Sequence, residues 1–178
     1  MLTDEEKREL TRELNGPLKL IRIPLGKSHE ATEFLKGLYR GGNGRFDPLV
    51  LINGNPVIEE GTKIGVFAEI YDKGGIVRIG ADCDIASHAS LNCADSHKKV
   101  LGLSSEIECK PITIGENVFI GQSAIILGGT NIGHHSVIGA GVLVPPGDYE
   151  PYTLFVGSPC HVKAGYYRRT VLEACQKD

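Results

Sequence analysis

Aliphatic residues recur at every sixth position along most of the chain. The series starts at Ile52, restarts at Ile79 after a Lys-Gly-Gly interruption, and runs without a break from Ile114 to Val144. Neither the 3.6-residue period of an α-helix nor the two-residue alternation of a strand repeats at six. A unit of six residues fits one short strand and one turn, and hexapeptide repeats are typical of a parallel β-helix.

Two further positions of each unit are restricted in residue type. The residue four after the aliphatic is small or β-branched, as at Thr62, Cys83 and Ala124, and we expect it to pack inward. Glycine repeatedly follows the aliphatic directly, and we interpret it as easing the turn. These glycines are Gly65, Gly80, Gly115, Gly121, Gly133 and Gly139. Three units complete one triangular coil, so the predicted fold class is an all-β core.

Helical patterns flank the repeats. Residues 3–14 begin with a Thr-x-x-Glu capping box, and residues 28–40 follow Ser28 as an N-cap. A third helix is expected at 164–176, with apolar side chains that cover the last coil, namely Tyr166, Tyr167, Val171, Leu172 and Cys175. The predicted organisation is an N-terminal helical segment at 1–50, a β-helix domain at 51–162 and a C-terminal helix at 163–178.

Composition and charge argue against several classes of protein. Among 178 residues, 19 basic and 22 acidic side chains leave a net charge of −3, which provides no bulk attraction to nucleic acid or acidic lipid. No apolar run approaches the roughly 18 residues of a membrane helix, and the polar start is no signal peptide, so we expect a soluble, cytoplasmic protein. Five cysteines without a C-x-x-C pair favour reduced thiols over a disulfide framework or zinc knuckle.

Three motifs resemble those of the hexapeptide-repeat acyltransferases, with the maltose, galactoside and xenobiotic acetyltransferases as the most similar group. They are P-I-T-I-G-E-N-V-F-I-G at 111–121, I-G-A-G at 138–141 and G-S-P-C-H-V-K at 157–163. The resemblance covers roughly residues 52–164. It implies a left-handed parallel β-helix, a homotrimer, and acetyl-CoA bound between subunits as the acyl donor, without a metal.

The long break in the repeats, residues 92–111, is the predicted site, because loops that leave a rigid scaffold often carry function. His97 lies 17 residues before Ile114, a distance similar to that of the catalytic histidine in the enzymes this chain resembles. Neutral imidazole suits removal of a proton from a hydroxyl or amine that attacks a thioester. Asn92 and Asp95 could orient the imidazole or bind the acceptor, or serve only as turn residues.

The resemblance also implies residues for acetyl-CoA. The pantetheine arm is expected along Gly121, Gln122, Ala140 and Gly141, although the repeat alone explains the glycines. The phosphates need cations, and the candidates are Lys163, Arg168 and Arg169, which fit a solvated helix face equally well. The dipeptide Pro145-Pro146 stands where the family often has Thr-Lys in contact with CoA.

The acceptor stays open at this stage. We expect acetyl transfer to an amino or hydroxyl group of a sugar, preferably nucleotide-linked, because segment 65–72 lacks the asparagine of the galactoside enzymes. A free saccharide or small xenobiotic is the alternative acceptor. His88, His134 and His135 keep a metal site like that of a γ-class carbonic anhydrase as a rival, and a non-catalytic scaffold is a third interpretation. The sequence around Cys93 shows no activating arrangement, and we expect Cys83 and Cys160 to be packed small residues.

Overall fold

The structure is a computed structural model in which residues 49–72 and 77–176 are described. The predicted helices at 3–14 and 28–40 therefore lie outside the described residues. The described residues belong to one compact unit. Among the described residues, no helix combines the length and apolar character that crossing a membrane requires.

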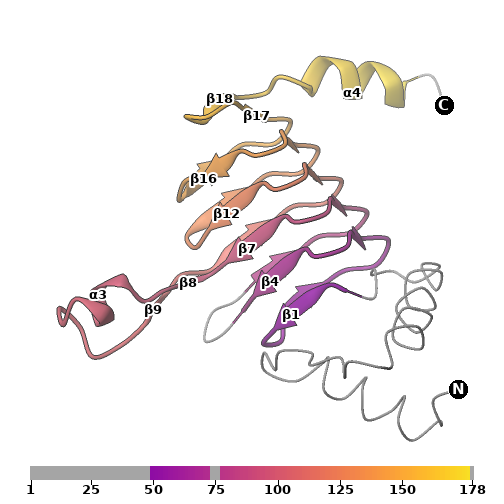
Figure 1. The fold of residues 1–178 in the computed structure, drawn as a ribbon. Helices are drawn as coiled ribbons and strands as arrows, with labels where there is room; N and C mark the ends of the chain where they lie inside the picture. The colour runs from indigo at the N-terminus through magenta and orange to yellow at the C-terminus, as the bar shows by residue number, and fades with distance from the viewer. Residues whose placement is uncertain (1–48, 73–76, 177–178) are drawn as a thin grey trace, which may run out of the picture. The chain divides into compact units, whose positions relative to one another are not determined.

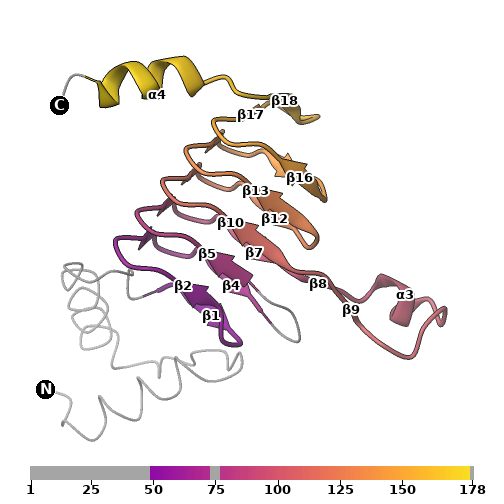
Figure 2. The same ribbon diagram turned by 180° about the vertical axis from the view of Figure 1, so that it is seen from behind.

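Short strands follow one another around successive coils (Figure 1 and Figure 2), and each coil contributes one strand to each of three sheets. From the first coil to the fifth they are β1 (Leu51–Asn53), β2 (Val57–Ile58), β3 (Lys63–Ile64); β4 (Glu69–Tyr71), β5 (Val77–Ile79), β6 (Asp84–Ile85); β7 (Ser90–Asn92), β10 (Ile112–Ile114), β11 (Phe119–Ile120); β12 (Ile125–Leu127), β13 (Thr130–Ile132), β14 (Val137–Ile138); and β15 (Leu143–Val144), β16 (Gly147–Tyr149), β17 (Leu154–Val156). The coils wind as a left-handed parallel β-helix, which confirms the predicted fold class.

The strands stack into three parallel sheets whose register follows the six-residue unit. Ile52 pairs with Ile70, 18 residues or three units later. Where the Lys-Gly-Gly interruption adds three residues, Ile58 pairs with Ile79, 21 residues later. The insertion after β7 lengthens the step from Ser90 to its partner Ile125 to 35 residues. The additional residues therefore leave the stacking register of the strands undisturbed.

The core is a column of aliphatic side chains along the axis of the coils. The repeat aliphatics from the end of the first coil onward are buried, namely Ile64, Ile70, Ile79, Ile85, Leu91, Ile114, Ile120, Ile126, Ile132, Ile138 and Val144. The small partners Thr62, Cys83 and Ala124 are buried as predicted. Ile52 was expected to be buried as well, but it is 41% exposed, because its strand belongs to the terminal coil.

The repeated glycine has a different role from the predicted one. A Cβ on Gly121 would lie 2.6 Å from the backbone nitrogen of Ala140 on the next coil, so glycine is needed for close stacking of coils. The positive backbone φ angles fall two residues further on, as at Ser123 (58°) and Gly141 (68°). The turn is therefore made at that later position, where several non-glycine residues also adopt the left-handed conformation.

The C-terminal segment ends the coils with a strand. β18 (His161–Lys163) pairs antiparallel with β17 and covers its open edge. The helix α4 (Arg168–Cys175) begins four residues later than predicted, after Gly165 at φ 64°, and none of its residues is buried. The expectation that Leu172 and its apolar neighbours cover the last coil is therefore wrong, because β18 already occupies that edge.

Candidate active site

The predicted site forms a structured arm that projects from the coils (Figure 1). It comprises the strand β8 (Ala94–Asp95), the one-turn helix α3 (His97–Val100) and the strand β9 (Glu108–Cys109), with β8 and β9 paired antiparallel. We call residues 94–109 the arm. Its base is closed by the backbone N–H of Lys110, which donates to the carbonyl of Cys93 at 2.8 Å. The prediction of a plain loop at 92–111 is corrected to a two-stranded ribbon with a helical turn.

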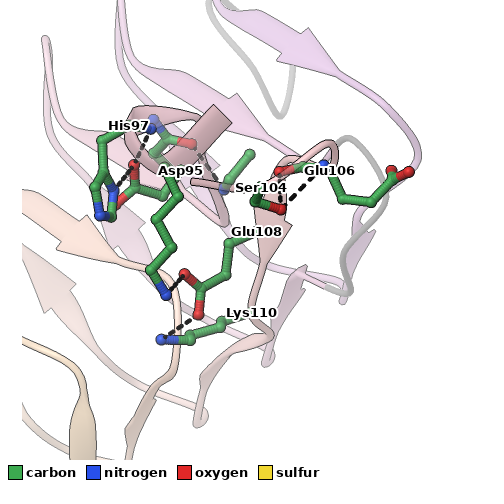
Figure 3. A network of polar contacts seen from close by, with 9 residues as sticks. Asp95, His97, Ser104, Glu106, Glu108 and Lys110 are labelled. Atoms are coloured by element: carbon green, nitrogen blue, oxygen red, sulfur yellow. Dashed lines mark hydrogen bonds and ion pairs between the residues drawn. The ribbon is translucent and has the colours of Figure 1, made fainter. Parts of the chain in front are cut away.

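Asp95 and His97 meet at the point where the ribbon turns into α3 (Figure 3). Oδ1 of Asp95 lies 2.6 Å from Nδ1 of His97 and accepts the backbone N–H of His97 at 3.0 Å. The backbone hydrogen bond, followed by the side-chain bond, lowers the pKa of the Asp95 carboxyl below its ordinary value. An ionised carboxylate only accepts hydrogen bonds, so Nδ1 carries the proton. In the neutral ring, Nε2 is therefore the basic nitrogen.

A second acidic side chain ties the arm together. The Glu108 carboxylate lies 2.9 Å from Nζ of Lys98 through one oxygen and 2.9 Å from Nζ of Lys110 through the other (Figure 3). Hydrogen bonds from Lys98 and Lys110 lower the pKa of Glu108, and the bond to Glu108 raises the pKa of Lys98. Sequence reasoning missed all three residues. The available signal was the pair of lysines at 98–99, together with the opposite charges of E-C-K at 108–110.

A hollow of about 120 Å³ lies between the base of the arm and the neighbouring corner of the coils. Its walls bring Asn92 and Asp95 together with the backbone of Gly128 and the ring of Pro146. The Asn92 side-chain oxygen accepts the backbone N–H of Ala94 at 3.0 Å, so this residue also serves the turn into the ribbon. Of the predicted acceptor-binding residues, the structure thus places Asn92 and Asp95 at one hollow.

The hollow lies at one edge of the sheet that contains β7, β12 and β15, and the predicted pantetheine-binding residues lie at its opposite edge. Gly121 and Gln122 follow β11, and Ala140 and Gly141 follow β14 directly above them. The backbone N–H of Gly141 donates to the carbonyl of Gln122 at 2.8 Å. The strand β12 runs from this corner to the corner at Gly128 beside the hollow. Within one chain, the structure brings these four residues together but separates them from His97.

The predicted phosphate-binding cations contact partners in their own chain. Nζ of Lys163 lies 5.6 Å from the centre of the Tyr166 ring. Arg168 lies 3.5 Å from the Glu150 carboxylate and over the Tyr152 ring, and Arg169 bonds to Glu173. All three side chains are exposed, so these contacts leave them in reach of a ligand.

The histidines considered for a metal lie at two different corners. His88 packs against Phe67, whereas Nδ1 of His134 lies 2.9 Å from Nδ1 of His135 beside Tyr152. In the part of the chain that the structure describes, no three histidine, cysteine, aspartate or glutamate side chains gather as a metal site would require. Their placement within one chain is thus unlike a three-histidine centre.

The cysteines divide by burial. Cys83 and Cys93 are buried, and Cys160 is half-buried against the core. Burial raises the pKa of the Cys83 and Cys160 thiols. The structure thus confirms the expected packing of Cys83 and Cys160.

A family model described as the hexapeptide repeat of succinyl-transferase matches residues 111–145. Galactoside O-acetyltransferase of Escherichia coli is 40% identical over 88 residues, which cover 48% of this chain and 42% of that protein. A putative acetyltransferase of Saccharomyces cerevisiae is 37% identical over 112 residues, or 62% of this chain and 50% of that protein. The chain thus spans half or less of the length of these curated relatives.

Solved structures share the fold over a larger part of the chain. Galactoside acetyltransferase in complex with coenzyme A superposes with a TM-score of 0.56 at 23% identity, covering 92% of this chain and 80% of that one. An N-acyltransferase of Bacillus cereus in complex with dTDP and 3-hydroxybutyryl-CoA gives a TM-score of 0.60 at 18% identity, covering 72% and 73%. The chain is therefore a hexapeptide-repeat protein similar to the acetyltransferases built on this left-handed β-helix.

Proposed function

We propose that this protein is an acetyl-CoA-dependent acetyltransferase that modifies an amino or hydroxyl group of a sugar, with His97 as the general base. The Asp95–His97 pair carries the proposal, because it leaves Nε2 of His97 as the basic nitrogen of an exposed ring, while Asp95 also lines the hollow. The His97 side chain is 55% exposed, so an acceptor can reach it without movement of the coils. The similarity to acetyltransferases supports the reaction class.

The proton moves along a simple path in this mechanism. As the acceptor's oxygen or nitrogen attacks the thioester carbonyl, Nε2 of His97 takes the proton from that atom. The Asp95 carboxylate, 2.6 Å from Nδ1, stabilises the imidazolium that forms. The tetrahedral oxyanion then collapses, the carbon–sulfur bond breaks, and the proton passes from Nε2 to the departing thiolate of CoA. We expect backbone N–H groups of the coils to stabilise the oxyanion.

The separation of the predicted donor residues from His97 favours a shared site between copies. Gly121 and Gly141 lie at one edge of the sheet and the arm at the other, with β12 between them. When two copies of the chain face each other, the arm of one copy can lie beside Gly121 and Gly141 of the next. We therefore expect a homotrimer in which acetyl-CoA lies in the groove between subunits. Exposed Lys163 and Arg168 remain the proposed partners of the CoA phosphates.

The proposed acceptor is a nucleotide-linked sugar. Solved structures of similar fold include an N-acyltransferase with dTDP-4-amino-4,6-dideoxyglucose and a polysialic-acid-specific acetyltransferase, the latter 28% identical with a TM-score of 0.51. These ligands and substrates belong to those proteins. The polar hollow of Asn92 and Asp95 suits hydroxyl and amino groups, so a free saccharide is the alternative acceptor.

Steady-state acetyl transfer to a panel of sugars and nucleotide-linked sugars tests the proposal. We expect His97→Ala to lower kcat by at least about a hundredfold, because a general base contributes roughly 10²–10⁴. His161→Ala is the matched control, since His161 is also exposed but lies on β18, away from the arm. Near-normal turnover by His97→Ala would exclude the base. No turnover on any acceptor, together with no CoA binding, would favour a scaffold.

A further inference from the structure

The arm places two carboxylates directly opposite each other. Asp95 and Glu108 are register partners in the antiparallel pair of β8 and β9. Like charges facing each other across a strand pair are destabilising. The ribbon has only two paired residues on each strand, and such a short pair is marginally stable by itself. The side chains around the acidic pair must therefore offset its repulsion.

Each carboxylate has its own partners, and those of Glu108 come from two parts of the chain. Lys98 belongs to α3 and directly follows His97, whereas Lys110 stands at the closed base of the arm, beside the coils. Both ammonium groups lie 2.9 Å from a Glu108 oxygen. A continuous path of contacts thus connects the coils, through Lys110, Glu108 and Lys98, to the helical turn that carries His97.

Apart from the bonds between Asp95 and His97 at its start, the helical turn α3 has few other constraints in the structure. None of its four residues is buried, and Ser96 at its N-cap makes no side-chain capping bond. Its backbone is held by local bonds such as that from Leu101 N–H to the His97 carbonyl at 3.0 Å. Those bonds shape the turn without fixing its direction relative to the hollow. The Lys98–Glu108 contact is a tie that can fix this direction.

We propose that Glu108 is a positioning residue that orients His97 by tethering α3 to the base of the arm. The inference rests on the proposed function, in which His97 must present Nε2 to an acceptor. The lowered pKa of Glu108 and the raised pKa of Lys98 agree with this bonding. Loss of the tether lets α3 turn, and displacement by about 1 Å of a group that acts on the reacting atoms can cost up to a hundredfold in rate.

Glu108→Gln tests the tether with little change in shape, and Glu106→Gln is the matched control on the same arm. Glu106 is exposed, and its backbone rather than its carboxylate contacts Ser104. We expect Glu108→Gln to lower kcat about five- to tenfold with an unchanged KM for acetyl-CoA. The melting temperature should stay within about 2 °C, because exposed ion pairs contribute little to stability. Glu106→Gln should match the native protein.

A spectroscopic measurement keeps this test separate from that of the proposed function. Nitrogen-15 spectra of the imidazoles report whether Nδ1 of His97 carries its proton in a hydrogen bond. We expect Glu108→Gln to weaken that signature and Glu108→Asp to restore part of it. If His97→Ala proves fully active, the proposed function fails, whereas the spectra still decide the tether. Native-like spectra and kcat for Glu108→Gln, or a loss of activity that only follows unfolding, would overturn the positioning role.

Discussion

The His97 imidazole presents one nitrogen to its own chain and leaves the other for a ligand. The Asp95 carboxylate holds Nδ1 at 2.6 Å and also accepts the backbone N–H of His97, so one side chain fixes both the ring and the start of α3. Because the contact spans two residues, its geometry depends on the local turn more than on the distant coils. The pairing of Asp95 with His97 is therefore encoded within a few consecutive positions.

We expect the carboxyl of Asp95 to titrate below its ordinary value of 3.8, because it accepts two hydrogen bonds from His97. A carboxyl with a lowered folded pKa stabilises the fold above its unfolded value, and this contribution is lost as the pH falls through the folded pKa. Carbon-13 titration of the side chain measures the midpoint. His97→Ala should raise it toward 3.8, and an unmoved midpoint would contradict the side-chain bond.

The Glu108 tether has an acid and an alkaline limit. Glu108, with a lowered pKa, contributes stability above its ordinary 4.5 and loses it as the pH falls through the folded value. Lys98, with a raised pKa, contributes below its ordinary 10.5 and loses it as the pH rises through the folded value. We expect the Glu108–Lys98 contact, followed by the chemical shifts of these two side chains, to stay intact between these limits and to be lost outside them. Lys98→Met should raise the pH of the acid limit, whereas Lys99→Met should leave it unchanged.

At the scale of the elements, stacking of coils depends on glycine at the position after the aliphatic. Gly121→Ala places a Cβ 2.6 Å from the Ala140 nitrogen, and we expect it to cost about 1–3 kcal/mol. Gly141→Asn is the matched control: nothing lies within 4 Å of its Cβ position, and asparagine tolerates a φ of 68°. Urea unfolding measures both. Equal losses would show that turn conformation, rather than coil contact, sets the need for glycine.

The six-residue period predicted the coils because every unit repeats the same burial. Ile70 and Leu91 could be assigned to the core from spacing alone, and both are fully buried. The arm could be located only as a break in the period. Its ribbon and helical turn depend on side-chain ties such as Lys98–Glu108, ten positions apart, and no periodic pattern records them. Glycine spacing was likewise found without its cause, since contact with the next coil is invisible in one unit.

At the scale of the whole molecule, the end of the arm carries apolar side chains that no other described residue covers. Val100, Leu101 and Leu103 are 80%, 67% and 74% exposed. In the proposed homotrimer this end is covered by a neighbouring copy, since exposed apolar groups of this kind mark contact sites.

We therefore expect the double substitution Leu101→Asp and Leu103→Asp to reduce the particle mass toward that of one chain in light scattering. Activity should fall with it, because the donor and base parts of the site then separate. Ser105→Asp adds a charge to the same arm without removing an apolar group, and it should preserve both mass and activity. An unchanged mass for the double variant would contradict a role of the arm in assembly.

The closed base of the arm has a consequence for how this protein can change over time. Cys93 and Lys110 are joined by a backbone hydrogen bond, and the strands on both sides of them stack in register as if the arm were absent. Bringing the ends of a loop together costs little more as the loop grows, so residues can be added between these two points at small expense. Selection can therefore change the length and sequence of the arm while the coils keep the residues that their stacking requires.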